Sequence, residues 1–137
     1  MKQGDKELLL RYLSMALPYG VKVQQFDDID AYKLLGIDGD VLHIDCPVYD
    51  EGDGYVEVEY CKPYLRLMSS MTEEEKKEFD NFCVIDEFVW EGKTEIGYKN
   101  QAIIMSVAIN WLLKKHFDFL GLIPKGLAIE VTEENYG

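Results

Sequence analysis

Short alternating segments separated by turn signals, between residues 21 and 61, constrain the fold more than any other feature of the chain. Apolar and polar residues alternate within 21–26 and 55–61, and this period of two is typical of half-buried strands. Residues 31–37 and 41–46 lie between turn signals and are read as the second and third strands. Asp38 and Gly39 form an Asp-Gly pair between the second and third segments, which favours a hairpin turn. Because such short connections cannot carry a parallel crossover, the sequence predicts a four-stranded antiparallel meander, which could curl into a small barrel.

The connections between these segments have the composition of turns and loops. Residues 27–30 are read as a turn and residues 50–54 as a loop, because both are rich in Asp or Gly. Asp-Gly segments also occur in calcium-binding loops, but neither segment has the alternating ligands and the terminal glutamate of an EF-hand loop. We therefore interpret them as turns.

A first helix is predicted before the strands, over residues 5–17. Leu9 and Leu13 recur at helical spacing, and Asp5 is a plausible N-cap. Pro18 then stops the helix, because proline cannot continue the ladder of backbone hydrogen bonds.

Two more helices are predicted in the second half of the chain. Thr72 and Glu75 match a capping box, so a helix is expected to begin there and to reach about residue 82. Its inward-facing side chains are expected to be Phe79, Phe82 and Cys83. Apolar residues cover most of the circumference of a longer helix predicted over 99–116, so we expect that helix to be the most buried element. Its buried centre is expected around Ile103, Val107 and Leu112.

The remaining segments complete an α+β arrangement. Residues 116–126 are expected to be an ordered turn or loop, and residues 127–131 a short strand, whereas 84–98 fits either strand or loop. The chain has 137 residues, of which 47% are hydrophobic, and this is enough for one core but not for two. The sequence therefore predicts a single domain over 1–137, in which the sheet packs against the N-terminal helix and the two later helices.

The cysteines and the apolar segments indicate a cytoplasmic protein. Cys46, Cys61 and Cys83 match no zinc or redox spacing, and we interpret them as reduced thiols, some of them in the core. Residues 1–17 do not have the pattern of a secretory leader, because charged side chains interrupt them. The longest apolar run, within 102–113, is too short to cross a bilayer, so no membrane contact is expected.

Acidic residues dominate one third of the chain. The net charge is −12, and residues 27–59 hold eleven acids and one base, Lys33. A surface of this sign repels phosphate backbones, so direct binding of nucleic acid is not expected. It could attract a protein partner with a basic surface, or it could simply be a solvated face that keeps the protein soluble.

One face of the predicted meander gathers groups that could carry chemistry. His43 and Asp45 point the same way along one strand, and Glu57 and Glu59 share a face of another. If the two strands pair in the right register, the four side chains form a cluster that could bind a partner, hold a divalent cation or act in acid–base catalysis. The alternative is the ordinary polar outer face of a half-exposed sheet.

Two further groups of residues could form sites. Lys62, Tyr64 and Arg66 form a short basic and aromatic stretch, which could contact a partner or could fasten the sheet to the following helix by internal salt bridges. His116 and Asp118 flank a helix end, where a capping or packing role is expected because no nucleophile is selected beside them. The chain has no nucleophile elbow, zinc-binding helix motif, phosphate loop or dinucleotide fingerprint, which removes the usual grounds for proposing an enzyme but does not exclude one.

Three segments resemble stretches of small phage and prophage proteins of unknown function. They are residues 61–75, residues 116–128, and the opening leucine-rich helix with residues 17–23. Where those proteins carry a proline after the arginine of the first segment, this chain has Leu67. The resemblance implies an origin in a mobile element and a cytoplasmic location, and it implies no reaction.

The sequence leads to one expected function and one alternative. We expect a non-catalytic phage or prophage accessory protein that acts through protein–protein interaction and needs no cofactor. The alternative is a divalent-metal-binding protein or a hydrolase that uses His43 and the acidic residues on one face of the sheet. The oligomeric state and the identity of the partner are open at this point.

Overall fold

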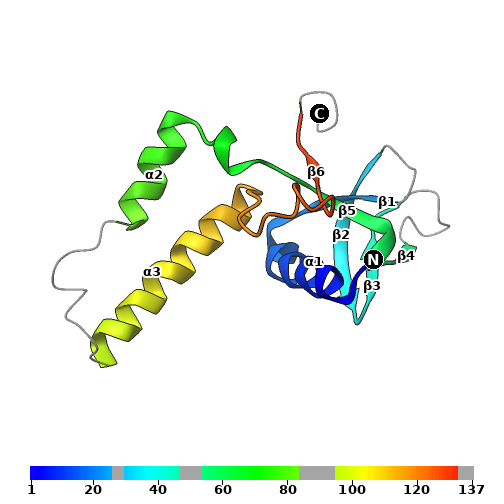
Figure 1. Ribbon diagram of the computed structural model, residues 1–137, viewed down its shortest axis with the longest axis horizontal. Coiled ribbons are helices and arrows are strands. Elements are labelled where there is room, and N and C mark those ends of the chain that lie inside the picture. The colour runs from blue at the N-terminus through cyan, green and yellow to red at the C-terminus, as the bar shows by residue number, and fades with distance from the viewer. Residues whose placement is uncertain (26–29, 47–53, 84–94, 133–137) are drawn as a thin grey trace.

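Four strands form the predicted antiparallel meander (Figure 1). The structure is a computed structural model that describes residues 1–25, 30–46, 54–83 and 95–132, with the backbone alone for residues 82, 83, 95–98 and 100. The strands are β1 (Lys22–Gln25), β2 (Ala31–Asp38), β3 (Val41–Ile44) and β4 (Gly54–Glu57), and each pairs antiparallel with the next. Apart from Asp30 and Gly54, the predicted turn at 27–30 and the predicted loop at 50–54 lie outside the described residues.

The β2–β3 hairpin turns on Gly39. Asp38 pairs with Val41, which leaves Gly39 and Asp40 as a two-residue turn. Gly39 has a φ of +61°, a conformation that costs glycine little but that most other residues avoid. The hairpin predicted from the Asp-Gly pair is therefore confirmed.

The fourth predicted strand, 55–61, is wrong as a single element. β4 ends at Glu57, and the chain passes through a 3₁₀ turn, η2 (Val58–Tyr60), into a new strand, β5 (Cys61–Leu65). Val58 and Cys61 are both fully buried, and their spacing of three is the period of a 3₁₀ helix rather than of a strand. A continuous strand would instead have turned Tyr60 inward, whereas 46% of that residue is exposed.

β5 leads the chain to the opposite edge of the sheet. It pairs antiparallel with β1 and parallel with β6 (Ile129–Glu130), which gives the strand order β4-β3-β2-β1-β5-β6. Three residues in η2 advance the chain by only about 6 Å, so the sheet must bend strongly to bring the end of β4 near the start of β5. The sheet nevertheless stays open within the described residues, and the suggested small barrel is not formed. The reason is that β1 and β6 already occupy both edges of β5.

The helix α1 (Gln3–Ala16) supplies much of the core. Leu9, Tyr12, Leu13 and Ala16 recur every three or four residues and are fully buried together with the inner face of the sheet. The expected N-cap at Asp5 is wrong: the helix begins two residues earlier, and Asp5 lies in its first turn. The predicted end of the helix is confirmed, because a 3₁₀ turn, η1 (Leu17–Tyr19), carries the proline and leads into β1.

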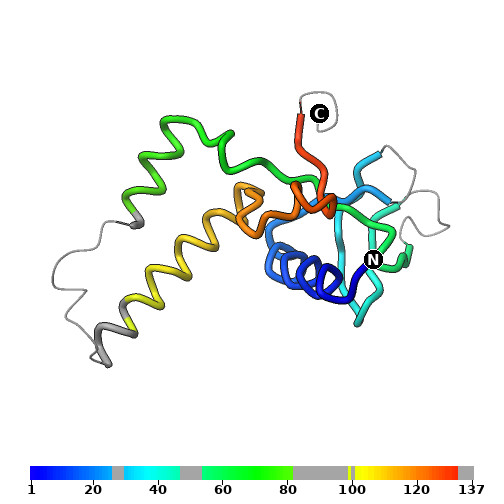
Figure 2. The backbone as a smooth tube through the Cα atoms, viewed as in Figure 1, coloured from blue at the N-terminus to red at the C-terminus, as the bar shows by residue number. Residues whose placement is uncertain are grey.

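The other two helices, α2 (Glu73–Cys83) and α3 (Glu95–Lys114), project from the body that α1 and the sheet form (Figure 1). The predicted capping box begins α2: the Glu75 backbone N–H donates to Thr72 Oγ1 at 3.1 Å, and the Thr72 backbone N–H donates to Glu75 Oε1 at 3.0 Å. Figure 2 shows that the chain leaves the body through the green segment before α2 and returns to it through the end of α3.

The expectation that α3 is the most buried element is wrong. Ile103 is 51% exposed and Val107 is 43% exposed, whereas Leu112, near the end of the helix, is buried. The physical reason is that α1 already covers the inner face of the sheet, so only the last turns of α3 meet the body. In the described part of the chain, no helix has both the length and the apolar character needed to cross a membrane.

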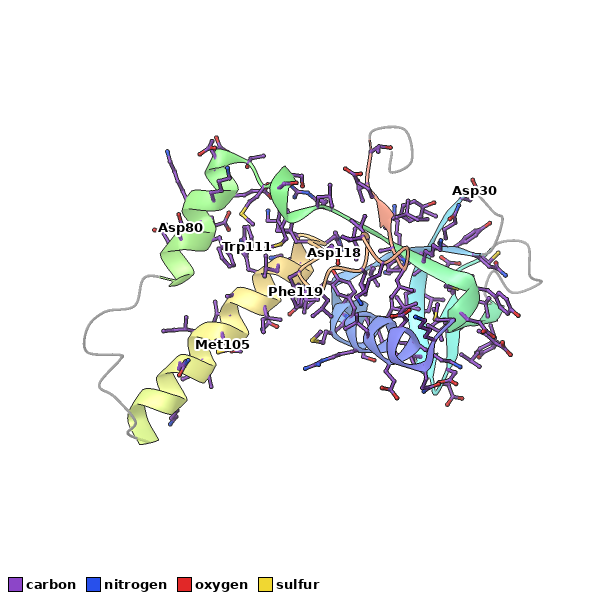
Figure 3. All side chains as sticks on the ribbon, viewed as in Figure 1. Asp30, Asp80, Met105, Trp111, Asp118 and Phe119 are labelled. Atoms are coloured by element: carbon purple, nitrogen blue, oxygen red, sulfur yellow. The ribbon has the colours of Figure 1, made fainter. Side chains whose placement is uncertain are left out.

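A small second core joins α2, α3 and the segment that follows α3. Trp111, Leu112 and Phe117 form its buried centre, and Phe79 of α2 packs against Trp111 with ring centroids 5.5 Å apart. Figure 3 shows Trp111 between the two helices. The inward orientation predicted for Phe79 is thus consistent with its contact, whereas the side chains of Phe82 and Cys83 lie outside the described residues.

Residues 116–126 form the ordered loop that the sequence predicts, and the short strand predicted over 127–131 is present as β6, limited to Ile129–Glu130. The Phe117 backbone N–H donates to Leu112 O at 2.9 Å and closes the end of α3, with His116 in the left-handed conformation at φ +63°. Both carboxylate oxygens of Asp118 accept backbone N–H groups, from Leu122 at 2.7 Å and from Ile123 at 2.8 Å. Asp118 therefore has a structural role, as expected, but it orders the loop after α3 and does not cap a helix.

Candidate functional site

The predicted cluster of His43, Asp45, Glu57 and Glu59 is only partly assembled. In the register of β3 and β4, His43 lies opposite Tyr55 and Val41 lies opposite Glu57, so His43 and Glu57 share a face but are two positions apart. The rings of His43 and Tyr55 stack with centroids 4.7 Å apart. Asp45 lies beyond the end of β3, where its backbone N–H donates to Lys33 O.

Glu57 and Glu59 do come together, although not by sharing the face of a strand. Glu57 ends β4 and Glu59 lies in the 3₁₀ turn η2. A hydrogen bond between the two carboxyl groups, followed by the charge of Glu59, raises the pKa of Glu57 above its ordinary value. Two exposed carboxylates held this close repel each other, and a proton or a cation between them relieves that repulsion.

A third carboxylate and a lysine complete this region. The Val58 backbone N–H donates to Asp40 O at 2.8 Å, which fixes the hairpin turn beside η2. Lys6 of α1 places its Nζ 2.9 Å from Asp40 Oδ2, and this bond is the main reason that the pKa of Lys6 is raised. We call Asp40, Glu57 and Glu59 the acidic edge, in which three carboxylates face one ammonium group.

The acids between residues 27 and 59 that the structure describes are turned to solvent. Those that the structure describes are all exposed: Asp30, Asp38, Asp40, Asp45, Glu57 and Glu59. In the described residues, no three His, Cys, Asp or Glu side chains are grouped closely enough to hold a metal ion. The acidic edge is therefore an exposed negative surface rather than an enclosed pocket.

Lys62 and Tyr64 lie in the strand β5, and Arg66 directly follows it. Lys62 is exposed, whereas Tyr64 is only 2% exposed. The guanidinium of Arg66 donates to both carboxylate oxygens of Glu75, at 2.9 and 2.7 Å, and lies 4.2 Å from the centre of the Phe117 ring. Fastening the sheet to the following helix, which was the alternative interpretation of this stretch, is thus confirmed for Arg66.

The ion pair of Arg66 and Glu75 strongly lowers the pKa of Glu75. The two hydrogen bonds from Arg66 are the main cause of the fall in the pKa of Glu75 to about 2. Glu75 also closes the capping box with Thr72, so one carboxylate caps α2 and anchors it to β5. The pairing holds the base of the projecting helices in place and leaves little of either side chain for a ligand.

The other candidate groups are buried within the fold. The Cys46 and Cys61 thiols are free and buried, as expected, and burial raises the pKa of Cys61 to about 12, which leaves it un-ionised and unreactive at neutral pH. Burial, followed by the charges of Arg66 and Lys22, lowers the pKa of His116. Neither a thiolate nor a nucleophile–base pair is formed among these residues.

Comparison with known proteins adds no relative. No protein-family model matches the chain, and neither a curated protein nor a solved structure matches it. The functional argument therefore depends on the residues themselves.

Two residues of this region were not singled out from the sequence: Asp40, which belongs to the acidic edge, and Lys6, which pairs with it. Asp40 could have been found, because a hairpin turn at Asp38 and Gly39 places it next to the strand that ends at Glu57. No sequence signal links Lys6 to this site, because it comes from α1 and reaches Asp40 only through the packing of α1 on the sheet.

Proposed function

We propose that the protein is a non-catalytic accessory protein of phage or prophage origin that binds a basic surface of a partner protein through the acidic edge. The observation that carries the proposal is the acidic edge itself: Asp40, Glu57 and Glu59 are all exposed, and the 2.8 Å bond from the Val58 backbone N–H to Asp40 O holds Asp40 beside the two glutamates. A lysine or arginine of a partner would relieve their repulsion and add charge-assisted hydrogen bonds. The resemblance of residues 61–75 and 116–128 to phage and prophage proteins supports the origin and a cytoplasmic location.

The stacked pair of His43 and Tyr55 supports a protein partner in particular. Tyr55 is 68% exposed and lies on the same face of β4 as Glu57, two positions away. Tyrosine beside acidic groups is a common anchor for arginine, which can stack on the ring while its guanidinium meets a carboxylate. A divalent-metal-binding protein or a hydrolase remains the alternative, and a cation that raises the melting temperature of the parent but not of Glu57→Gln/Glu59→Gln would favour it.

The test is capture of a partner from a lysate of the bacterial host, treated with nuclease, on three immobilised proteins. They are the parent, the double variant Glu57→Gln/Glu59→Gln, and the control Glu73→Gln/Glu74→Gln, which makes the same charge change at exposed positions of α2. We expect a protein with a basic surface to be retained by the parent and the control and lost by the first variant. Equal retention by all three proteins, or capture of nothing specific by the parent, would refute the proposal.

A further inference from the structure

The two projecting helices are joined to the body where the chain leaves the sheet after β5 and where it returns after α3 (Figure 2). Two backbone hydrogen bonds hold these passages side by side: the Arg66 N–H donates to His116 O at 2.8 Å, and the Asp118 N–H donates to Arg66 O at 2.8 Å. Arg66 and Phe117 also form a parallel bridge. We call α2 and α3 the arm, and Arg66, His116, Phe117 and Asp118 the neck.

The side chain of His116 occupies a poor site for a positive charge. Its Nδ1 is buried and has no hydrogen-bond partner among the described residues. A neutral imidazole can leave this nitrogen as a bare acceptor, whereas an imidazolium carries a proton on both ring nitrogens. Protonation in the closed neck would therefore bury a charged N–H group that has nothing to donate to.

The charged groups around the ring also disfavour its protonation. Burial is the main cause of the lowered pKa of His116, and the charges of Arg66, just after β5, and of Lys22 in β1 lower it further. The carboxylates of the same junction are engaged by other groups: Glu75 of α2 accepts two hydrogen bonds from Arg66, and Asp118 accepts two backbone N–H groups of the loop that follows it. The pKa of Glu75 is about 2, so this carboxylate stays ionised while a histidine titrates.

We infer that His116 is a pH-sensitive switch of the neck: its neutral form allows the neck to close, and its protonation opens the neck and releases the arm from the body. Opening brings the imidazole into water, where neither burial nor the two cations oppose its charge. The body keeps most of its core when the arm is released, because that core consists mainly of α1 and the sheet, with Leu113 from α3. Release is therefore a local opening, which needs less free energy than unfolding.

The direction of the pH effect follows from the two states of the neck. The pKa of His116 is lowered in the closed neck and returns toward 6.5 in the open one, so opening takes up a proton. The closed neck is fully favoured above pH 6.5 and is lost progressively as the pH falls below that value. The ratio of open to closed molecules rises by up to about tenfold for each pH unit in that range.

The test is amide hydrogen exchange of the full chain, followed by NMR from about pH 7.5 to about pH 5. The amides of Arg66 and Asp118 report opening of the neck, and their protection factors correct for the pH dependence of the chemical exchange step. We expect these factors to fall by up to about tenfold per pH unit below 6.5, together with the protonation of the His116 ring seen in its own resonances. The Leu34 amide, which donates to Val21 O within the body, should be better protected than both at every pH.

Two variants assign the effect to one ring, because the chain has only two histidines. His116→Asn removes the titrating group and keeps a residue that tolerates the positive φ, so the protection of the neck amides should no longer fall with pH. His43→Asn removes the other histidine, which lies in β3, and should open with the same pH dependence as the parent.

Three results would overturn the inference. The first is constant protection of the neck amides while the His116 ring titrates. The second is exchange of the neck amides as slow as that of Leu34, which would mean that the neck opens only when the whole protein unfolds. The third is loss of the pH effect in His43→Asn, and this variant keeps the inference testable if His116→Asn does not fold. None of these results affects the proposal for the acidic edge, which is tested by partner capture.

Discussion

Replacing Glu75 by glutamine tests whether the Arg66–Glu75 pair fastens the projecting helices to the sheet. Glutamine is accepted at the third position of a capping box, so Glu75→Gln keeps the cap of α2 and removes only the charge that faces Arg66. The control is Glu74→Gln, which removes a carboxylate from the same turn at an exposed position.

The expected loss follows from the electrostatics of the pair. A fall of the pKa of Glu75 from 4.5 to about 2 corresponds to roughly 3 kcal/mol. The Arg66 side chain is 27% exposed and that of Glu75 is 13% exposed, so solvent screens part of the interaction and we halve the figure to about 1.5 kcal/mol. At pH 7 we therefore expect Glu75→Gln to lower the free energy of unfolding by about 1.5 kcal/mol.

The pH dependence of the stability loss shows whether the charge of Glu75 causes it. Because folding lowers the pKa of Glu75, its contribution is fully present above pH 4.5 and is lost as the pH falls through about 2. Urea unfolding of the parent and both variants across this range measures the difference directly. A difference between parent and Glu75→Gln that stays constant down to pH 2, or an equal loss in Glu74→Gln, would refute the reasoning.

Three further predictions concern the core and the loop after α3, and urea unfolding checks each. Leu9→Ala should lower the free energy of unfolding by about 3 kcal/mol because Leu9 is fully buried, whereas Ile103→Ala should change it by less than about 0.5 kcal/mol. Similar losses in the two variants would mean that α3 is a core helix. Tyr12→Phe should cost about 1–2 kcal/mol, because it removes the 3.0 Å bond to Phe117 O and leaves a buried carbonyl unsatisfied; no loss would mean that water replaces the hydroxyl. Folding lowers the pKa of His116, so the native state favours its neutral form, and the free energy of unfolding should fall as the pH drops below 6.5. The variant His116→Asn keeps a residue that tolerates the positive φ and should lose less stability over that range. An equal loss in parent and variant would show that His116 is not the group responsible.

The local features of the fold were predictable because they depend on neighbours in sequence. The hairpin at Gly39 and the capping box of Thr72 and Glu75 each follow from residues within a few positions. The path after Glu57 was not predictable from alternation alone, since Val58 and Cys61 are spaced for a 3₁₀ turn within a run that otherwise alternates. The parallel pairing of β6 with β5 depends on contacts distant in sequence, for which one chain gives no signal.

The burial of α3 could not be predicted from its composition. A helix that is apolar around its circumference is expected in a core, but here α1 already fills the inner face of the sheet. The candidate site shows the same division: the closeness of Glu57 and Glu59 was expected, whereas the salt bridge from Lys6 to Asp40 arises only when α1 packs on the sheet.

The affinity of a purified partner for the protein, measured against salt concentration, tests the role of the acidic edge most directly. If the edge binds a basic surface, the association constant for the parent should fall as salt rises, and Glu57→Gln/Glu59→Gln should bind more weakly and with a smaller dependence on salt. An affinity that is independent of salt, or that is unchanged in this variant while Glu73→Gln/Glu74→Gln weakens it, would contradict the role proposed for the acidic edge.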